Sequence, residues 1–181
     1  MIQELKIAQS RVGVLIGKGG ATKKELESKT NTTISIDSKE GLVKVEGAEE
    51  NAIPLLRAVE IINAVNAGFS PERAFEMIED EDLLLDVIDL SRAADNPKQL
   101  DRLRGRIIGK DGKAREQIEN MTDVDLSVFG HTVALIGYPE QMKVARAAID
   151  MLIEGVPHEN VFAFLDKKKK EAKQDMISYY Y

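Results

Sequence analysis

Short runs of alternating apolar and polar residues are separated by segments with helical spacing, and this order of patterns occurs twice along the chain. Such alternation is typical of half-buried strands. The turn residues 37–41 separate two alternating runs and predict a hairpin. In the first half, strands are predicted over Glu4–Ala8, Thr33–Ile36 and Leu42–Gly47, and helices over Arg11–Ile16, Ala21–Lys29 and Ala48–Ala67, the last ending at Gly68.

The second half follows the same order. Asn96 and Pro97 have the residue types of an N-cap and a first helical residue, so we expect a helix from there toward Ile108. The segment Ser91–Leu100 is extra relative to the first half. The other predicted elements are a strand over Leu83–Leu90, a helix over Lys113–Met121, strands over Asp125–Phe129 and Thr132–Gly137, and a helix over Pro139–Glu154.

The two halves also share residue identities. When Val12–Ile36 is laid over Arg104–Val128, an offset of 92, eight of the 25 positions are identical. They are Gly13/Gly105, Ile16/Ile108, Gly17/Gly109, Lys18/Lys110, Gly20/Gly112, Glu27/Glu119, Thr30/Thr122 and Ser35/Ser127. After each copy a similar segment opens another helix, GFSPE from Gly68 and GVPHE from Gly155. We interpret the chain as two copies of one module.

A lysine among glycines first suggests a phosphate-binding loop of a nucleotide hydrolase. That loop requires GxxxxGK followed by Ser or Thr. Here Gly13 and Gly17 are one residue too close, and Gly19 follows Lys18; the second copy fails in the same way. What remains is GxxG between two short helices in both copies. Glycines allow another backbone to approach, and the next helix directs its first amides toward an anion. This arrangement suits the sugar-phosphate backbone of a single strand.

The composition argues against disulfides, metal sites and membrane spans. The chain has no cysteine and only two histidines, His131 and His158, so we expect no disulfide, no metal site and no cofactor. No apolar run reaches the roughly 18 residues of a membrane span, and the N-terminus lacks the apolar core of a secretory signal. We therefore expect a cytoplasmic protein. The carboxylates of residues 79–82 have no partner histidine, and we interpret them as a solvated surface.

The charge is unevenly distributed. The net charge of −6 argues against indiscriminate coating of nucleic acid. Residues 72–89 hold eight acidic side chains and one basic, whereas residues 102–115 hold six basic side chains and one acidic. Two surfaces of opposite sign suggest two different partners, although two solvated helix faces would give the same pattern.

The residues around the two GxxG loops resemble those of a known family of modules. VGVLIGKGGATKKELESKTNTTISI and RGRIIGKDGKAREQIENMTDVDLSV resemble K-homology (KH) modules of the type with a C-terminal helix, a family that clamps about four nucleotides of single-stranded RNA across the GxxG loop. The resemblance implies an α+β fold of two tandem type I KH modules, each a three-stranded sheet packed on three helices, plus a C-terminal helix. The implied divisions are a first module over 1–67, an acidic helical connector over 68–82, a second module over 83–154, and a C-terminal helix and tail over 155–181.

The resemblance also assigns the RNA-binding residues. Bases would lie on an apolar groove floor while phosphates cross the loop, and the main site is expected in the second module because basic residues surround its loop. In the first module the implied residues are Ile16, Gly17, Lys18, Gly19, Gly20, Lys23, Leu26 and Ile34. In the second they are Arg104, Arg106, Ile108, Gly109, Lys110, Asp111, Gly112, Lys113, Arg115, Ile118 and Leu126.

The layout of the whole chain resembles the archaeal form of the "partner of Nob" ribosome assembly factors. That family assists maturation of the small ribosomal subunit near the 3′ end of its RNA. The implied partners are this single-stranded rRNA segment and either a processing nuclease or a ribosome-assembly or translation factor. In eukaryotic relatives the first module has lost its GxxG, whereas this sequence keeps both, so whether the first module binds RNA stays open.

Two other functions are consistent with parts of the sequence. A KH protein associated with the exosome, or a translational regulator, would share the loops; archaeal exosome KH subunits also carry an S1 barrel, for which no strand-rich segment is visible. An enzyme is the third class, but the sequence offers no convergent catalytic set. We expect a monomer that is not an enzyme.

Overall fold

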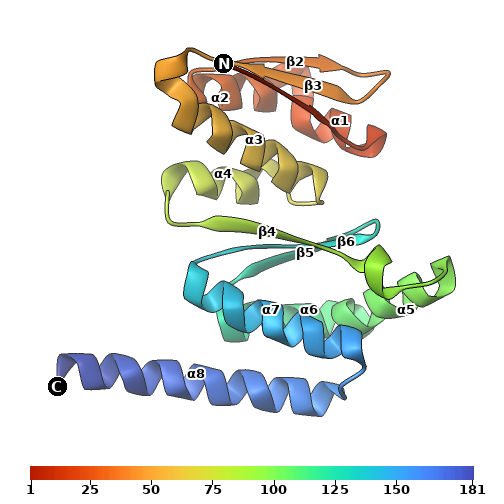
Figure 1. Cartoon of the computed structure of the whole chain (residues 1–181), viewed down its shortest axis with the longest axis vertical. Coiled ribbons are helices and arrows are strands. Elements are labelled where there is room, and N and C mark those ends of the chain that lie inside the picture. Colours follow the sequence, from red (N-terminus) through yellow and green to blue (C-terminus); the bar gives the residue numbers. More distant parts are fainter. The chain divides into compact units, whose positions relative to one another are not determined.

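Each half of the chain forms a three-stranded antiparallel sheet covered by helices on one face (Figure 1). The structure is a computed structural model that describes residues 1–181, and it divides into two units, Met1–Leu83 and Leu84–Tyr181. The fold class predicted from the sequence, two type I KH modules with a C-terminal helix, is confirmed.

The first unit has the strand order β1-β3-β2. Its elements are β1 (Ile2–Lys6), α1 (Gln9–Ile16), α2 (Ala21–Thr30), β2 (Thr33–Asp37), β3 (Leu42–Glu46), α3 (Ala52–Asn66) and α4 (Pro71–Glu79). The register pairs Ile34 with Val45 and Ile36 with Val43. Leu15, Leu26, Ile34, Val43 and Val45 are buried in its core.

The second unit repeats this plan with the order β4-β6-β5. Its elements are β4 (Leu84–Asp89), α5 (Pro97–Ile108), α6 (Lys113–Thr122), β5 (Asp125–Phe129), β6 (Thr132–Gly137), α7 (Pro139–Glu154) and α8 (His158–Tyr180). Leu126 pairs with Leu135 and Val128 with Val133. Ile107, Ile118, Leu126, Leu135 and Ile149 belong to its core.

Three predicted elements differ from the structure by two residues or more at a boundary, and one of them is α1, which begins at Gln9 and not at Arg11. The first strand covers Ile2–Lys6 and not Glu4–Ala8, because its partner β3 reaches back only to Leu42, which lies opposite Lys6. The long helix begins at Ala52 and not at Ala48, after one short 3₁₀ turn over Glu49–Asn51. Pro54 then lies in the first turn of α3, where its missing N–H is not needed.

Identities shared by the two copies are explained by hydrogen bonds that recur in both units. A carboxylate oxygen of Glu27 accepts from the backbone N–H of Ile34 at 2.9 Å, and Glu119 accepts from that of Leu126 at 3.1 Å. Each bond ties the second helix of a module to an edge strand. The buried hydroxyls of Thr30 and Thr122 donate to the carbonyl four residues earlier, each at 2.7 Å.

In each unit an arginine holds the end of the third helix. In the first unit, Arg11 donates to the carbonyls of Val65 and Phe69 at 2.7 and 2.8 Å. In the second, Arg106 donates to those of Leu152 and Val156 at 3.0 and 2.5 Å. These carbonyls lie at the negative end of the helix dipole, where a cation is favourable.

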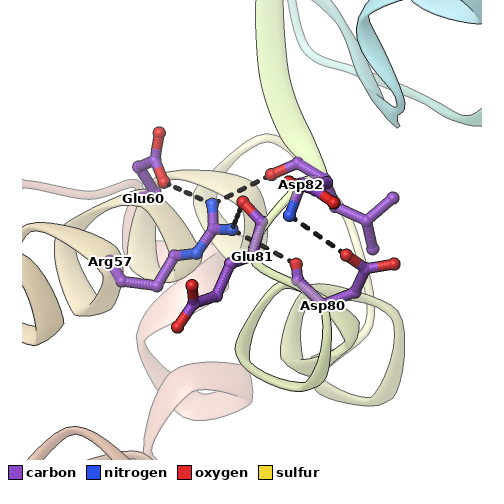
Figure 2. Close-up of polar contacts among 6 residues, drawn as sticks. Arg57, Glu60, Asp80, Glu81 and Asp82 are labelled. Atoms are coloured by element: carbon purple, nitrogen blue, oxygen red, sulfur yellow. Dashed lines mark hydrogen bonds and ion pairs between the residues drawn. The ribbon is translucent and has the colours of Figure 1, made fainter.

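A further arginine fixes the acidic segment that follows α4. Arg57 on α3 donates to the carbonyls of Asp80, Glu81 and Leu83 at 3.2, 2.7 and 3.0 Å, and it pairs with Glu60 at 2.8 Å (Figure 2). The amide of Asp82 donates to the Asp80 carboxylate at 3.0 Å. The segment is therefore attached to the first unit through its backbone carbonyls.

Helices α4 and α8 form an additional layer in their own units. Helix α4 packs on α3 and α2, and α8 packs on α6 and α7, so both lie on the side of the helices that faces away from the sheet (Figure 1). None of the helices combines the length and apolarity that crossing a bilayer requires.

Candidate nucleic-acid interface

The two GxxG loops have nearly the same backbone conformation. Gly17 and Gly109 have φ, ψ of 73°, 174° and 73°, 176°, a region that only glycine adopts readily. Gly20 and Gly112 are left-handed, with φ of 78° and 73°. Each loop closes with the same hydrogen bond, from Gly20 to the Gly17 carbonyl at 3.1 Å and from Gly112 to the Gly109 carbonyl at 3.2 Å.

The first glycine of each loop is also required by packing. A Cβ at Gly17 would lie 2.8 Å from the backbone nitrogen of Thr22, and one at Gly109 would lie 2.8 Å from that of Ala114. A side chain there would push the loop away from the helix that follows it. By contrast, a Cβ at Gly19, Gly112 or the helical Gly105 would meet nothing within 4 Å. These three positions present backbone to open space.

Each loop presents an exposed lysine beside a helix N-terminus that no side chain caps. Lys18 and Lys110 are exposed, and neither has a carboxylate within ion-pairing distance. Helices α2 and α6 start at the loops with no side chain capping their first amides. Uncapped amides at a helix N-terminus together with a free ammonium favour an anionic group such as a phosphate.

Comparison with known proteins identifies the family. The family model for the second KH domain of PNO1, described as a eukaryotic-type (type I) KH domain, matches residues 84–170, and the KH domain model matches residues 2–64. A KH domain-containing protein of Methanocaldococcus jannaschii is 39% identical over 96% of this chain and 76% of its own. The chain belongs to the KH-domain family of PNO1 and Dim2p proteins.

Solved structures extend the similarity to the fold. Dim2p from Pyrococcus horikoshii superposes with a TM-score of 0.85 at 41% identity, covering 92% of this chain and 99% of that one. A structure described as an a/eIF2alpha–aDim2p–rRNA complex from the same organism gives 0.88 at 42% identity, covering 94% and 95%. The RNA-binding protein pno1 of Dictyostelium discoideum is 30% identical over 68% of this chain, which spans about half (52%) of that relative.

The apolar residues expected on the groove floors of these KH modules fall into two groups. Leu26, Ile34, Ile118 and Leu126 are 0–1% exposed, so they support a groove from beneath and offer no surface to a base. Ile16 and Ile108 are partly exposed. Two further side chains on the same faces of the edge strands are also partly exposed, Ile36 beyond Ile34 and Val128 beyond Leu126. Sequence reasoning missed these two, although strand alternation pointed to them.

The basic side chains expected at the second loop have different surroundings. Arg106 is engaged with the end of α7. Arg115 pairs with Glu119 at 3.4 Å, as Lys23 pairs with Glu27 at 3.3 Å in the first unit. Arg104 lies 3.8 Å from Asp101. Only Lys110 and Lys113 among these side chains have no partner, and Arg102, which was not expected in the site, has none either.

A groove opens beside the second loop. Its volume is about 600 Å³. Its walls are formed by Gly105, Gly109, Ala114 and the side chains of Arg102, Arg106, Lys110, Lys113, Gln117, His158 and Phe162. We call it the basic groove. The His158 ring nitrogen Nε2 lies 2.8 Å from the Arg106 carbonyl, and its ring centroid is 6.0 Å from that of Phe162. Neither His158 nor Phe162 was expected in the site from the sequence.

The first unit has a groove at the corresponding place, between α2 and α4. It is smaller, about 290 Å³, and Glu25, Lys29, Phe75 and Glu79 are among its lining residues. We call it the acidic groove. Lys29 pairs with Glu25 at 3.1 Å and Glu79 at 3.3 Å and lies 5.6 Å from the Phe75 ring. Hydrogen bonds to Glu25 and then Glu79 raise the pKa of Lys29.

Proposed function

We propose that this protein is an RNA-binding factor, without catalytic activity of its own, that holds a single-stranded segment near the 3′ end of small-subunit rRNA during maturation of the subunit. The observation that carries this proposal is the pair of GxxG loops with one backbone conformation, each presenting a free lysine and an uncapped helix N-terminus. Such a loop positions phosphates, while the adjoining apolar groove receives bases.

The names of relatives support rRNA as the class of RNA and a ribosome-assembly or translation factor as the class of protein partner. Several are named pre-rRNA-processing proteins, and one structure is described as a complex of aDim2p with a/eIF2alpha and rRNA. We infer that this chain likewise binds rRNA and a ribosome-assembly or translation factor. A processing nuclease is the other partner expected from the family resemblance.

Binding of labelled RNA to loop variants tests the proposal. The probe is the 3′-terminal segment of small-subunit rRNA from the source organism, measured by fluorescence anisotropy against a scrambled sequence. Lys110→Glu and Lys18→Glu reverse the loop charges, and Lys98→Glu makes the same change at an exposed position outside the loops. We expect Lys110→Glu to weaken binding by roughly tenfold or more at low salt, and Lys98→Glu by about twofold.

Equal losses for all three variants would refute the loop assignment. Crosslinking of the tagged protein to RNA in cells tests the biological target separately. A single peak near the 3′ end of small-subunit rRNA is expected. Crosslinks spread over messenger RNAs would overturn the assembly role and favour a general regulator.

A further inference from the structure

The basic groove is continuous with the second GxxG loop. Lys110 and Lys113 belong both to the loop region and to the groove wall, and Arg102 also lines the groove, two turns before the loop on α5. A strand whose phosphates cross the loop therefore has a cationic route into the groove. The apolar groove that KH modules use for bases lies instead between the end of α5 and the edge strand β5, where Ile108 and Val128 are partly exposed.

The chemistry of the basic groove fits a nucleotide. None of its lining residues is acidic. Of its four cations, Arg106 donates to the carbonyls at the end of α7, and Arg102, Lys110 and Lys113 have no partner. Phe162 is partly buried, and its ring is tilted by 52° from that of His158, which is oriented by the Arg106 carbonyl. Aromatic rings beside free cations are the combination that stacks a base and contacts its phosphate.

The first unit shows that the fold does not require this charge. Phe75 and Phe162 lie at equivalent places, each seven residues after the glycine that ends the preceding helix. In the acidic groove, however, the positions around Phe75 are occupied by Glu25, Glu72, Glu76 and Glu79, and Lys29 covers the ring. The same architecture thus carries opposite charge in the two units, so the cations of the second groove are not a consequence of folding.

We propose that the basic groove is an additional RNA subsite, which takes one nucleotide flanking the segment held at the second GxxG loop, with the base on Phe162 and the phosphate on Arg102 and Lys113. This proposal rests on the proposed function. It extends the contacts of the second unit beyond the roughly four nucleotides of a KH clamp.

The test compares two RNA lengths on the full chain. One RNA has about four nucleotides and fills only the clamp, and the other has about eight and extends on both sides. Arg102→Gln and Phe162→Leu alter the subsite. Lys98→Gln and Phe164→Leu are matched controls, because Lys98 is an exposed cation on α5 and Phe164 is a partly buried phenylalanine on α8, and neither lines the groove.

We expect both subsite variants to weaken binding of the longer RNA by roughly fivefold or more, which is the lower end of the effect of losing one stacked base. Binding of the short RNA should be unchanged. Arg102→Gln should also reduce the slope of log affinity against log salt by about 0.7 for the longer RNA. A longer RNA that carries 4-thiouridine outside the clamped segment should crosslink to the peptide that contains Phe162.

The outcomes separate the two proposals. If the unmodified protein binds neither RNA, the proposed function fails. If it binds both RNAs but the subsite variants match their controls on the longer one, the RNA-binding function stands and the subsite is refuted. Crosslinks only to residues of the edge strand would refute the subsite as well.

Discussion

At the scale of single residues, the two loops differ at one position whose backbone is nearly unchanged. Gly19 has φ, ψ of 62°, 20°, and its counterpart Asp111 has 56°, 27°. Asparagine and aspartate tolerate this left-handed region better than other side chains. The second loop therefore carries a carboxylate beside its lysine without a change of shape, and this carboxylate opposes a bound phosphate.

Exchanging these residues between the loops isolates the effect of the charge. Asp111→Gly should raise the affinity for short single-stranded RNA about two- to fivefold at low salt, because it removes a repulsion of up to about 1 kcal/mol. Gly19→Asp should lower any binding by the first unit by a similar factor. Both effects should shrink at high salt. Anisotropy titrations that give Asp111→Gly an unchanged or weaker affinity would contradict a phosphate at this loop.

The two outer glycines of the second loop should differ in their sensitivity to alanine. Gly109→Ala places a Cβ 2.8 Å from the Ala114 nitrogen in a conformation open only to glycine, so we expect a loss of about 3 kcal/mol in the free energy of unfolding. Gly112→Ala meets open space and should cost about 1–2 kcal/mol.

Tyrosine near-ultraviolet dichroism in urea measures this difference in the second unit alone, since all four tyrosines of the chain lie within residues 138–181. Equal losses for the two alanine variants would mean that the contact with Ala114 does not hold the loop in place.

At the scale of elements, Arg106 links α5 to the end of α7. Replacing it with glutamine leaves two carbonyls without their charged donor, and we expect the second unit to lose about 1.5–3 kcal/mol. Arg102→Gln, one turn earlier on the same helix, should change stability by less than about 0.5 kcal/mol because that side chain has no partner.

For RNA affinity we expect the opposite order, with the larger loss for Arg102→Gln. Among folded molecules, Arg102→Gln should weaken binding of the longer RNA more than Arg106→Gln, because the Arg106 guanidinium is already engaged. Urea unfolding and anisotropy on the same samples give both rankings. A larger affinity loss for Arg106→Gln would mean that its guanidinium leaves the α7 carbonyls to contact RNA.

Element order and type could be predicted because several strands alternate, such as Thr33–Asp37, and some helices have clear end signals, such as Asn96 and Pro97 before α5. The roles of the basic residues could not, because proximity in sequence does not show which carbonyl or carboxylate a side chain reaches. Arg106 was expected on RNA, and the structure adds a second role, because its guanidinium donates to two carbonyls at the end of α7. Arg102 and Phe162 line one groove because α8 packs on α6, and no local pattern reveals that packing.

At the scale of the whole molecule, the net charge of −6 is distributed unevenly between the two units. Glutamates dominate the acidic groove of the first, and free cations line the basic groove of the second. Both units nevertheless keep a GxxG loop with an unpaired lysine. The acidic groove therefore does not identify the first unit as one that avoids RNA, and a measurement has to separate the two loops.

A strand long enough to reach both loops provides that measurement. If both units hold it, the second contact becomes intramolecular, and the effective concentration raises affinity well above that of either unit. Each added phosphate contact should also steepen the salt dependence by about 0.7 in the slope of log affinity against log salt. Lys18→Glu should then reduce both the affinity and the slope for the long strand, while a strand confined to the second loop is unaffected. An unchanged affinity of Lys18→Glu for every length would assign RNA binding to the second unit alone.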